Sequence, residues 1–139
     1  MNQKYPELDI DILIVRNNKI LLGLLSDKWF FEGQQVYGVP GRQILFGESI
    51  GDTVRRNIKE ELDCDVLSHK VISVNANYYN GHFVGIGVLV EITGEPKLLK
   101  SEDWIKWEWF DRDNLPHNLF PPTKNLLDCY LNNKFCVCE

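Results

Sequence analysis

Three side chains on one predicted helix carry oxygen atoms at a spacing that suits metal binding. Asn57 and Glu61 are four residues apart, and Glu60 lies three residues beyond Asn57. Side chains three or four positions apart lie on the same face of a helix, so these three can converge on one point. Carboxylate and amide oxygens in that arrangement suit a hard divalent ion, Mg²⁺ or Mn²⁺, better than zinc. An ordinary helix edge with salt bridges to nearby basic residues would show the same spacing, so both interpretations stay open at this point.

Glu61 differs from a usual surface carboxylate because it falls within the apolar stripe of this helix. At about 100° per residue, the aliphatic side chains of residues 49–62 form one stripe, and Glu61 projects between Ile50 and Val54. Arg55 and Lys59 project well away from the stripe and form the solvated side. An unpaired carboxylate on a packing face is costly, so we expect Glu61 to meet a cation or strong hydrogen-bond donors.

The elements predicted around this helix form a mixed sheet. The helix itself is predicted over residues 49–62, with Ser49 as its N-cap and Asp52 three residues later. A last helix is predicted to begin at Pro121-Pro122. Apolar runs, alternating or continuous, predict strands over residues 8–15, 19–25, 36–39, 66–79, 82–92 and 105–110, with a hairpin turn at Asn80-Gly81. This order of elements predicts an α/β layered domain.

Length and charge narrow the classes of function. The chain of 139 residues has the size of a single domain, predicted over residues 1–139. Its formal net charge of −5 disfavours generic binding to nucleic acid polymers or anionic membranes, so a phosphate ligand would need a metal or a local basic patch. The sequence has neither an apolar run long enough to span a bilayer nor an N-terminal signal core, so we expect a cytoplasmic protein.

Residues 39–66, VPGRQILFGESIGDTVRRNIKEELDCDV, resemble the Nudix box, which is placed at about residues 41–64. The demanding positions of that pattern are occupied in register by Glu48, Arg56, Ile58, Glu60 and Glu61. The runs HFVGIGVLVEITGEPKLL and WEWFDRDNLP also look like MutT-type members of the superfamily. The resemblance implies the Nudix α/β/α sandwich with a mixed β-sheet. It also implies Mg²⁺-dependent cleavage of the diphosphate linkage in a nucleoside diphosphate derivative, such as a nucleoside triphosphate, ADP-ribose or a nucleotide sugar.

The same resemblance implies roles for individual residues. Glu60 and Glu61 would hold the metal with the carbonyl of Gly41, and Glu102 loosely matches a further acid that many members carry after the box. Arg56 would anchor the glutamates from behind, and Glu48 would orient them or bind a second metal through water. The catalytic set implied is Glu48, Arg56, Glu60 and Glu61, and the substrate-binding set is Arg42, Tyr79 and Phe120.

Three positions depart from the box. Arg42 stands in place of the opening glycine, Asp63 in place of the closing glycine, and Asn57 in place of the glutamate of the Arg-Glu pair. Asparagine keeps an oxygen ligand but loses the negative charge and any role as a base, so Glu60, Glu102 or a metal-bound hydroxide would have to take the proton.

Two alternatives to a pyrophosphohydrolase follow from the asparagine. GDP-mannose mannosyl hydrolases also lack that box glutamate, and they cleave at the sugar carbon instead of between the phosphates. A nucleotide-binding protein without turnover is the other alternative. In each case the expected partner is a small-molecule nucleotide, and Trp107 and Trp109 belong either to the core or to the surface of a homodimer.

Overall fold

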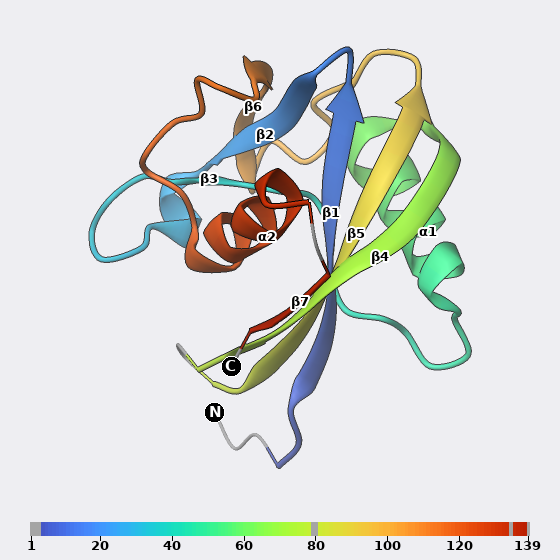
Figure 1. Ribbon diagram of the computed structural model, residues 1–139. Coiled ribbons are helices and arrows are strands. Elements are labelled where there is room, and N and C mark those ends of the chain that lie inside the picture. The colour runs from blue at the N-terminus through green and yellow to red at the C-terminus, as the bar shows by residue number, and fades with distance from the viewer. Residues whose placement is uncertain (1–3, 79–80, 134, 139) are drawn as a thin grey trace.

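The computed structural model describes residues 4–78, 81–133 and 135–138, which form a twisted sheet with a helix on each face (Figure 1). The strands are β1 Glu7–Arg16, β2 Lys19–Leu25, β3 Tyr37–Gly38, β4 Asp65–Asn77, β5 Phe83–Thr93, β6 Trp104–Asp111 and β7 Cys136–Cys138. The helices are α1 Ile50–Leu62, α2 Pro121–Leu131 and the short 3-10 helix η1 Asp27–Trp29. The predicted α/β/α sandwich with a mixed sheet is confirmed.

The sheet has the order β3-β2-β1-β5-β4-β7, and β6 pairs with β2. β1 is antiparallel to β2 but parallel to β5, and β4 is antiparallel to β5. The predicted strand at 36–39 is reduced to the two residues of β3, whereas β7 follows the last helix and was not predicted. The predicted turn at 80–81 includes residue 80, which lies outside the described residues.

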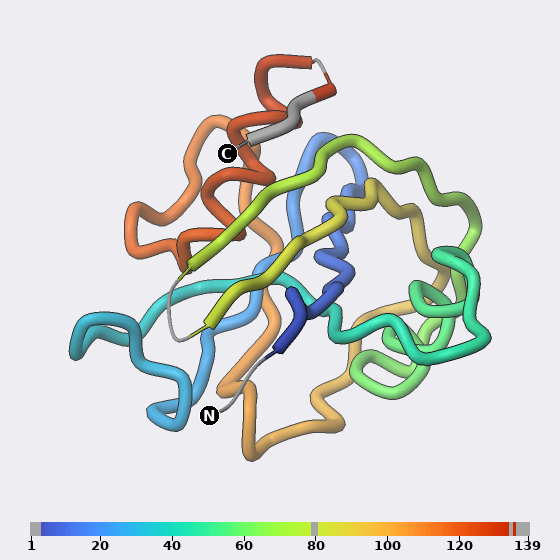
Figure 2. The backbone as a smooth tube through the Cα atoms, turned by 90° about the horizontal axis from the view of Figure 1, so that it is seen from below, coloured from blue at the N-terminus to red at the C-terminus, as the bar shows by residue number. Residues whose placement is uncertain are grey.

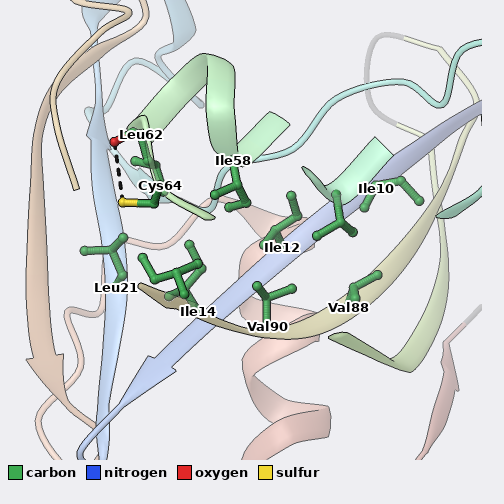
Figure 3. Packing of buried hydrophobic residues seen from close by; sticks show 11 residues of the cluster. Ile10, Ile12, Ile14, Leu21, Ile58, Leu62, Cys64, Val88 and Val90 are labelled. Carbon is green, nitrogen blue, oxygen red and sulfur yellow. Dashed lines mark hydrogen bonds between the residues drawn. The ribbon is translucent and has the colours of Figure 1, made fainter. Parts of the chain in front are cut away.

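The two helices cover opposite faces of the sheet, as the view in Figure 2 shows. Alternate side chains of β1 point to the two sides: Ile10, Ile12 and Ile14 pack with α1, and Leu13 packs with α2. Figure 3 shows the α1-side core, in which Ile58 and Leu62 meet the strand residues Val88 and Val90. Trp107 and Trp109 pack against this core from β6, which agrees with one of their two predicted places.

Helix α1 begins and ends as its sequence predicts. Ser49 Oγ accepts the Asp52 N–H at 3.0 Å, and Asp52 Oδ2 accepts the Ser49 N–H at 3.0 Å, so both members of the capping box are made. Asp63, at the position of the closing glycine, has a φ of 54° and a left-handed conformation. Lys97 at 2.9 Å and Lys59 at 3.4 Å pair with its carboxylate, which anchors this unusual C-cap.

The loop between β3 and α1 runs along the N-terminal half of β1 and brings the start of the box to the sheet. Ile10 N donates to Arg42 O and Ile12 N to Pro40 O, both at 2.9 Å. Gly41 between them has a φ of 134°, and a Cβ there would clash with the carbonyl of Ile10. Only glycine fits this position, so Gly41 is fixed against β1.

No helix within the described part of the chain has both the length and the apolar content needed to cross a membrane.

Candidate active site

A cavity of about 590 Å³ opens where the end of α1, the start of β6 and the loop after β2 meet β1. Three kinds of side chain line it. Gly41, Arg42 and Glu61 come from the box, further acids come from β1 and from the residue before β6, and aromatic rings come from the loops. A cavity of this size that combines apolar walls with a few charged groups is typical of a small-molecule site.

Glu61 is the box carboxylate that reaches the cavity, although only 2% of it is exposed to solvent. Its Oε2 accepts the Gly41 N–H at 3.0 Å, and its Oε1 accepts the Trp104 Nε1–H at 3.2 Å. These are the strong donors that a carboxylate on a packing face requires. Burial raises the pKa of Glu61 in spite of these two hydrogen bonds, so this carboxylate gains from any cation that approaches it.

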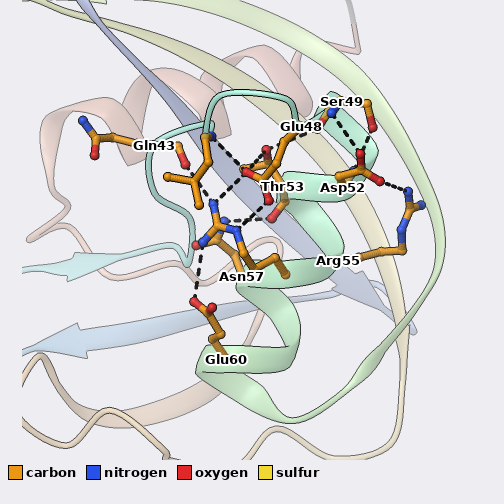
Figure 4. Close-up of polar contacts among 10 residues, drawn as sticks. Gln43, Glu48, Ser49, Asp52, Thr53, Arg55, Asn57 and Glu60 are labelled. Carbon is orange, nitrogen blue, oxygen red and sulfur yellow. Dashed lines mark hydrogen bonds and ion pairs between the residues drawn. The ribbon is translucent and has the colours of Figure 1, made fainter.

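Glu48, labelled in Figure 4, lies at the other end of the box and forms a bidentate pair with Arg56. Arg56 Nε lies 2.7 Å from Glu48 Oε2, and Arg56 Nη2 lies 3.0 Å from Glu48 Oε1. Glu48 Oε1 also accepts the Leu45 N–H and the Thr53 hydroxyl, both at 2.9 Å. The hydrogen bonds from Arg56 are the main reason that the pKa of Glu48 is lowered to about 2. Both oxygens of Glu48 are therefore committed to holding the loop on α1.

Glu60 and Asn57 flank Glu61 but point to different surroundings. The Glu60 side chain is 50% exposed and lies 3.5 Å from Arg56 Nη1, and it is not among the residues that line the cavity. Asn57 is 1% exposed, and its Nδ2 donates to Thr53 O at 2.8 Å. Its Oδ1 has no hydrogen-bond partner among the described residues. Of these three side chains, Glu61 is the one that lines the cavity.

The oxygen atoms of Glu60, Glu61 and Asn57 fit a hard divalent cation whose remaining ligands are water or substrate oxygens. Within residues 4–78, 81–133 and 135–138, no group of three or more His, Cys, Asp or Glu side chains lies close enough together to hold a metal. Mg²⁺ commonly keeps several water molecules and uses one or two carboxylates together with phosphate oxygens of the substrate. A desolvated Glu61, an accessible Glu60 and the unpartnered oxygen of Asn57 match such a site.

The acid that the structure places in the cavity near β6 is Asp103, next to the predicted Glu102. Glu102 is exposed and outside the cavity lining, and its backbone carbonyl accepts the Ser26 hydroxyl at 2.8 Å. Asp103 lines the cavity and accepts hydrogen bonds from Arg42, Lys28 and Trp29. Burial raises the pKa of Asp103, but the hydrogen bonds from Trp29 and Lys28 and the nearby cations outweigh it and leave the pKa lowered.

Two further acids, Asp9 and Asp11, line the cavity from β1, and sequence reasoning missed them. Burial, then the charge of Glu7, raises the pKa of Asp9 to about 6. Burial, then the charge of Asp9, raises the pKa of Asp11 to about 7. A Cβ on Gly85 of β5 would lie 2.5 Å from Asp11 Oδ2, so the glycine leaves the room that this carboxylate occupies.

Of the predicted substrate-binding residues, Arg42 and Phe120 line the cavity, and Tyr79 lies outside the described residues. Phe120 precedes α2 and packs edge-on against Phe31, with ring centroids 6.3 Å apart. Trp29 and Phe30 also line the cavity and are 40% and 48% exposed. Exposed rings at the mouth of a cavity offer faces on which a base can stack.

The chain resembles proteins of one family over most of its length. A model of the NUDIX domain matches residues 6–129. An ADP-ribose pyrophosphatase from Methanocaldococcus jannaschii is 30% identical over 130 residues, which cover 89% of this chain and 73% of the relative. The crystal structure of a MutT NUDIX hydrolase from Burkholderia pseudomallei has a TM-score of 0.82 and 26% identity, with 91% of this chain and 98% of that chain covered. An ADP-ribose pyrophosphatase from Streptococcus suis shares the fold, with a TM-score of 0.67 and 20% identity. Its alignment covers 96% of this chain and 98% of that chain.

The sandwich fold and the cavity next to the box define an α/β scaffold with a small-molecule site. The chain belongs to the Nudix family. It is a Nudix hydrolase, of the class that acts on phosphoric anhydride bonds.

Proposed function

We propose that this protein is a Mg²⁺- or Mn²⁺-dependent pyrophosphohydrolase that cleaves the diphosphate linkage of a nucleoside diphosphate derivative, with ADP-ribose as the first candidate. The observation that carries the proposal is that Glu61 and Arg42 face the same cavity. A carboxylate that can hold a cation and a guanidinium that can bind phosphate oxygens are thus close together. The name of the relative from Methanocaldococcus jannaschii supports ADP-ribose over other derivatives.

Glu61, Glu60 and the carbonyl of Gly41 would hold the metal ion. When bound, this ion would neutralise the diphosphate and lower the pKa of the attacking water. Glu48 and Arg56 position the loop against α1 and do not touch the substrate, because their polar atoms already pair with each other. Water attacks one phosphorus atom, the bridging oxygen leaves with the other phosphate, and each product keeps a phosphate group.

The proton of the attacking water needs a basic acceptor. Asn57 cannot supply one, and Glu48 has its oxygens occupied. Glu60 remains the box carboxylate with solvent access, and its contact with Arg56 at 3.5 Å is long. We assign the general base to Glu60, one of the candidates that the sequence offered, ahead of Glu102, which lies outside the box.

The rest of the cavity would hold the nucleoside. Arg42 and Lys28 supply positive charge at the rim, which an acidic protein with a net charge of −5 needs to attract a phosphate compound. The rings of Phe30 and Phe120 would contact the base. The expected ligand is a free nucleotide of the cytoplasm, and formation of a homodimer stays a prediction.

A panel of nucleotides with product identification tests the proposal. Purified protein is incubated with Mg²⁺ and each of ADP-ribose, nucleoside triphosphates and nucleotide sugars. AMP and ribose 5-phosphate from ADP-ribose support the proposal. Asn57 favours one second candidate, the glycosyl hydrolase, which would release a free sugar and an intact nucleoside diphosphate. Nucleotide binding without any turnover would contradict the proposed hydrolysis and indicate a nucleotide-binding protein.

A further inference from the structure

Asp103 is a nearly buried carboxylate that collects donors from two separate loops. Its Oδ2 lies 2.7 Å from Arg42 Nη2, and its Oδ1 accepts from Trp29 Nε1 at 2.9 Å and from Lys28 Nζ at 3.3 Å. Its backbone carbonyl accepts the Ser26 N–H at 2.8 Å, which ties the same segment to the start of η1. Arg42 belongs to the box loop and the other donors to the loop after β2, so Asp103 joins both walls of the cavity.

The carboxylate is enclosed, but the cations it holds are open. The side chain of Asp103 is 6% exposed, whereas those of Arg42 and Lys28 are 47% and 59% exposed. Asp103 takes one donor atom from each cation, so their other N–H groups can still reach a ligand in the cavity that both line. The fixed carboxylate of Asp103 therefore orients the two cations and leaves N–H groups of both available to a ligand.

The same contacts connect these cations to the box carboxylate in a closed ring. Gly41 and Arg42 are neighbours in the chain, as are Asp103 and Trp104. Gly41 N and Trp104 Nε1 donate to the two oxygens of Glu61, at 3.0 and 3.2 Å, while Arg42 pairs with Asp103. The ring sets the position of the Arg42 guanidinium relative to the Glu61 carboxylate.

We propose that Asp103 is a positioning residue that holds Arg42 and Lys28 where they bind the diphosphate of the substrate. The inference rests on the proposed function, because it takes a nucleoside diphosphate as the ligand. An ordered cation loses less conformational entropy when it binds phosphate than a mobile one does, so the anion behind it strengthens binding. The opposite role is that of a competitor, in which Asp103 occupies the cations and weakens phosphate binding. The two roles predict changes of opposite sign when the carboxylate is removed.

Calorimetry with two ligands separates these roles. The first ligand is α,β-methylene-ADP, whose bridging carbon prevents hydrolysis, and the second is adenosine, which lacks the phosphates. Both are titrated in Mg²⁺ buffer into the wild type, Asp103→Asn and the control Asp111→Asn. Asp111 lies at the far end of β6, the strand that begins directly after Asp103, and its exposed carboxylate is 4.0 Å from Lys19.

Asp103→Asn should lower the affinity for α,β-methylene-ADP about 10- to 100-fold, which corresponds to the loss of one or two charge-assisted hydrogen bonds. Adenosine affinity should stay near that of the wild type, and Asp111→Asn should bind both ligands as the wild type does. Unchanged or tighter binding of α,β-methylene-ADP, or an equal loss for both ligands, would overturn the positioning role. A wild type that does not bind α,β-methylene-ADP would instead reject the proposed function itself.

Two further variants keep the test decisive. Asp103→Glu preserves the charge but displaces it by one methylene, so it should weaken α,β-methylene-ADP even if Asp103→Asn fails to fold. In an Arg42→Gln background, Asp103→Asn should lose much of its effect, because part of its action passes through Arg42. A full, additive effect in that background would show that Asp103 acts by another route.

Discussion

Trp104 of β6 donates its indole N–H to Glu61 Oε1 of α1 across 3.2 Å. The indole is held in place from its other side. A Cβ on Gly23 of β2 would clash with this ring, and Trp107 packs against it at a tilt of 35°, with ring centroids 4.3 Å apart. A strand residue 43 positions away in sequence thus fixes the orientation of the carboxylate that we assign to the metal.

Trp104→Phe should weaken metal binding without unfolding the protein. The phenyl ring retains most of the packing against Gly23, but Glu61 Oε1 loses its donor. Loss of a hydrogen bond to a metal ligand typically costs about tenfold or more in affinity, so we expect about that loss for Mn²⁺ in calorimetry. Trp109→Phe removes an indole from the same strand without touching Glu61 and is the matched control. Equal Mn²⁺ affinities for the two variants would show that the indole has no such role.

Glu61→Gln should abolish Mg²⁺-dependent turnover while the fold survives. Glutamine has the same shape, and its amide oxygen can keep one of the two hydrogen bonds, from Gly41 or Trp104. The change also removes a charge that burial disfavours, so we expect the Tm to shift by less than about 5 °C. Thermal unfolding and a hydrolysis assay check this pair of results. Retained turnover would refute the metal assignment, and Glu91→Gln on the exposed side of β5 serves as the control.

Much of the fold could be predicted because it follows from local patterns. Alternation of apolar residues located the long strands to within two residues at their ends, and Ser49 with Asp52 located the start of α1. β3 and β7 are short and depend on pairing with distant strands: Tyr37 with Leu24, and Cys136 with Ser73. Pairings of this kind are set by tertiary packing, which a local pattern does not contain.

The candidate site divides in the same way. Helical spacing placed Glu61 on a packing face and predicted that it needs donors, and the structure supplies them from Gly41 and Trp104. Neither donor could be named from spacing, because each comes from another part of the chain. Asp9 and Asp11 were missed although the alternation in LDIDI signals two acids on one face of a buried strand. What makes them site residues is the register that places Asp9 opposite Gly85, where a side chain is lacking.

The wild type should become less stable to unfolding as the pH rises, and Asp11→Asn should reduce this dependence on pH. The folded state binds the Asp11 proton more tightly than the unfolded chain, because burial and Asp9 raise its pKa to about 7. Stability is therefore lost as the pH rises from about 4, the pKa in the unfolded chain, through about 7. Denaturant unfolding at pH 5 and pH 8 should show wild type losing about 2–4 kcal/mol more than Asp11→Asn between these values. Asp113→Asn, an exposed carboxylate, should keep the wild-type slope, and an unaltered slope in Asp11→Asn would contradict the assignment.

Asn57→Glu tests whether the asparagine weakens metal binding because it lacks the charge of a carboxylate ligand. The side chain is 1% exposed with an unpartnered Oδ1, so a carboxylate there is buried without a donor unless a cation is present. In chelator the variant should lose about 1–3 kcal/mol of stability. With Mg²⁺ it should regain that stability and bind the ion about tenfold more tightly, because a third carboxylate raises the ligand charge. Asn57→Leu, which fills the position without a ligand, is the control and should show no Mg²⁺-dependent change in Tm beyond that of the wild type. Calorimetry that finds the same Mg²⁺ affinity in Asn57→Glu and the wild type would mean that Asn57 does not face the metal.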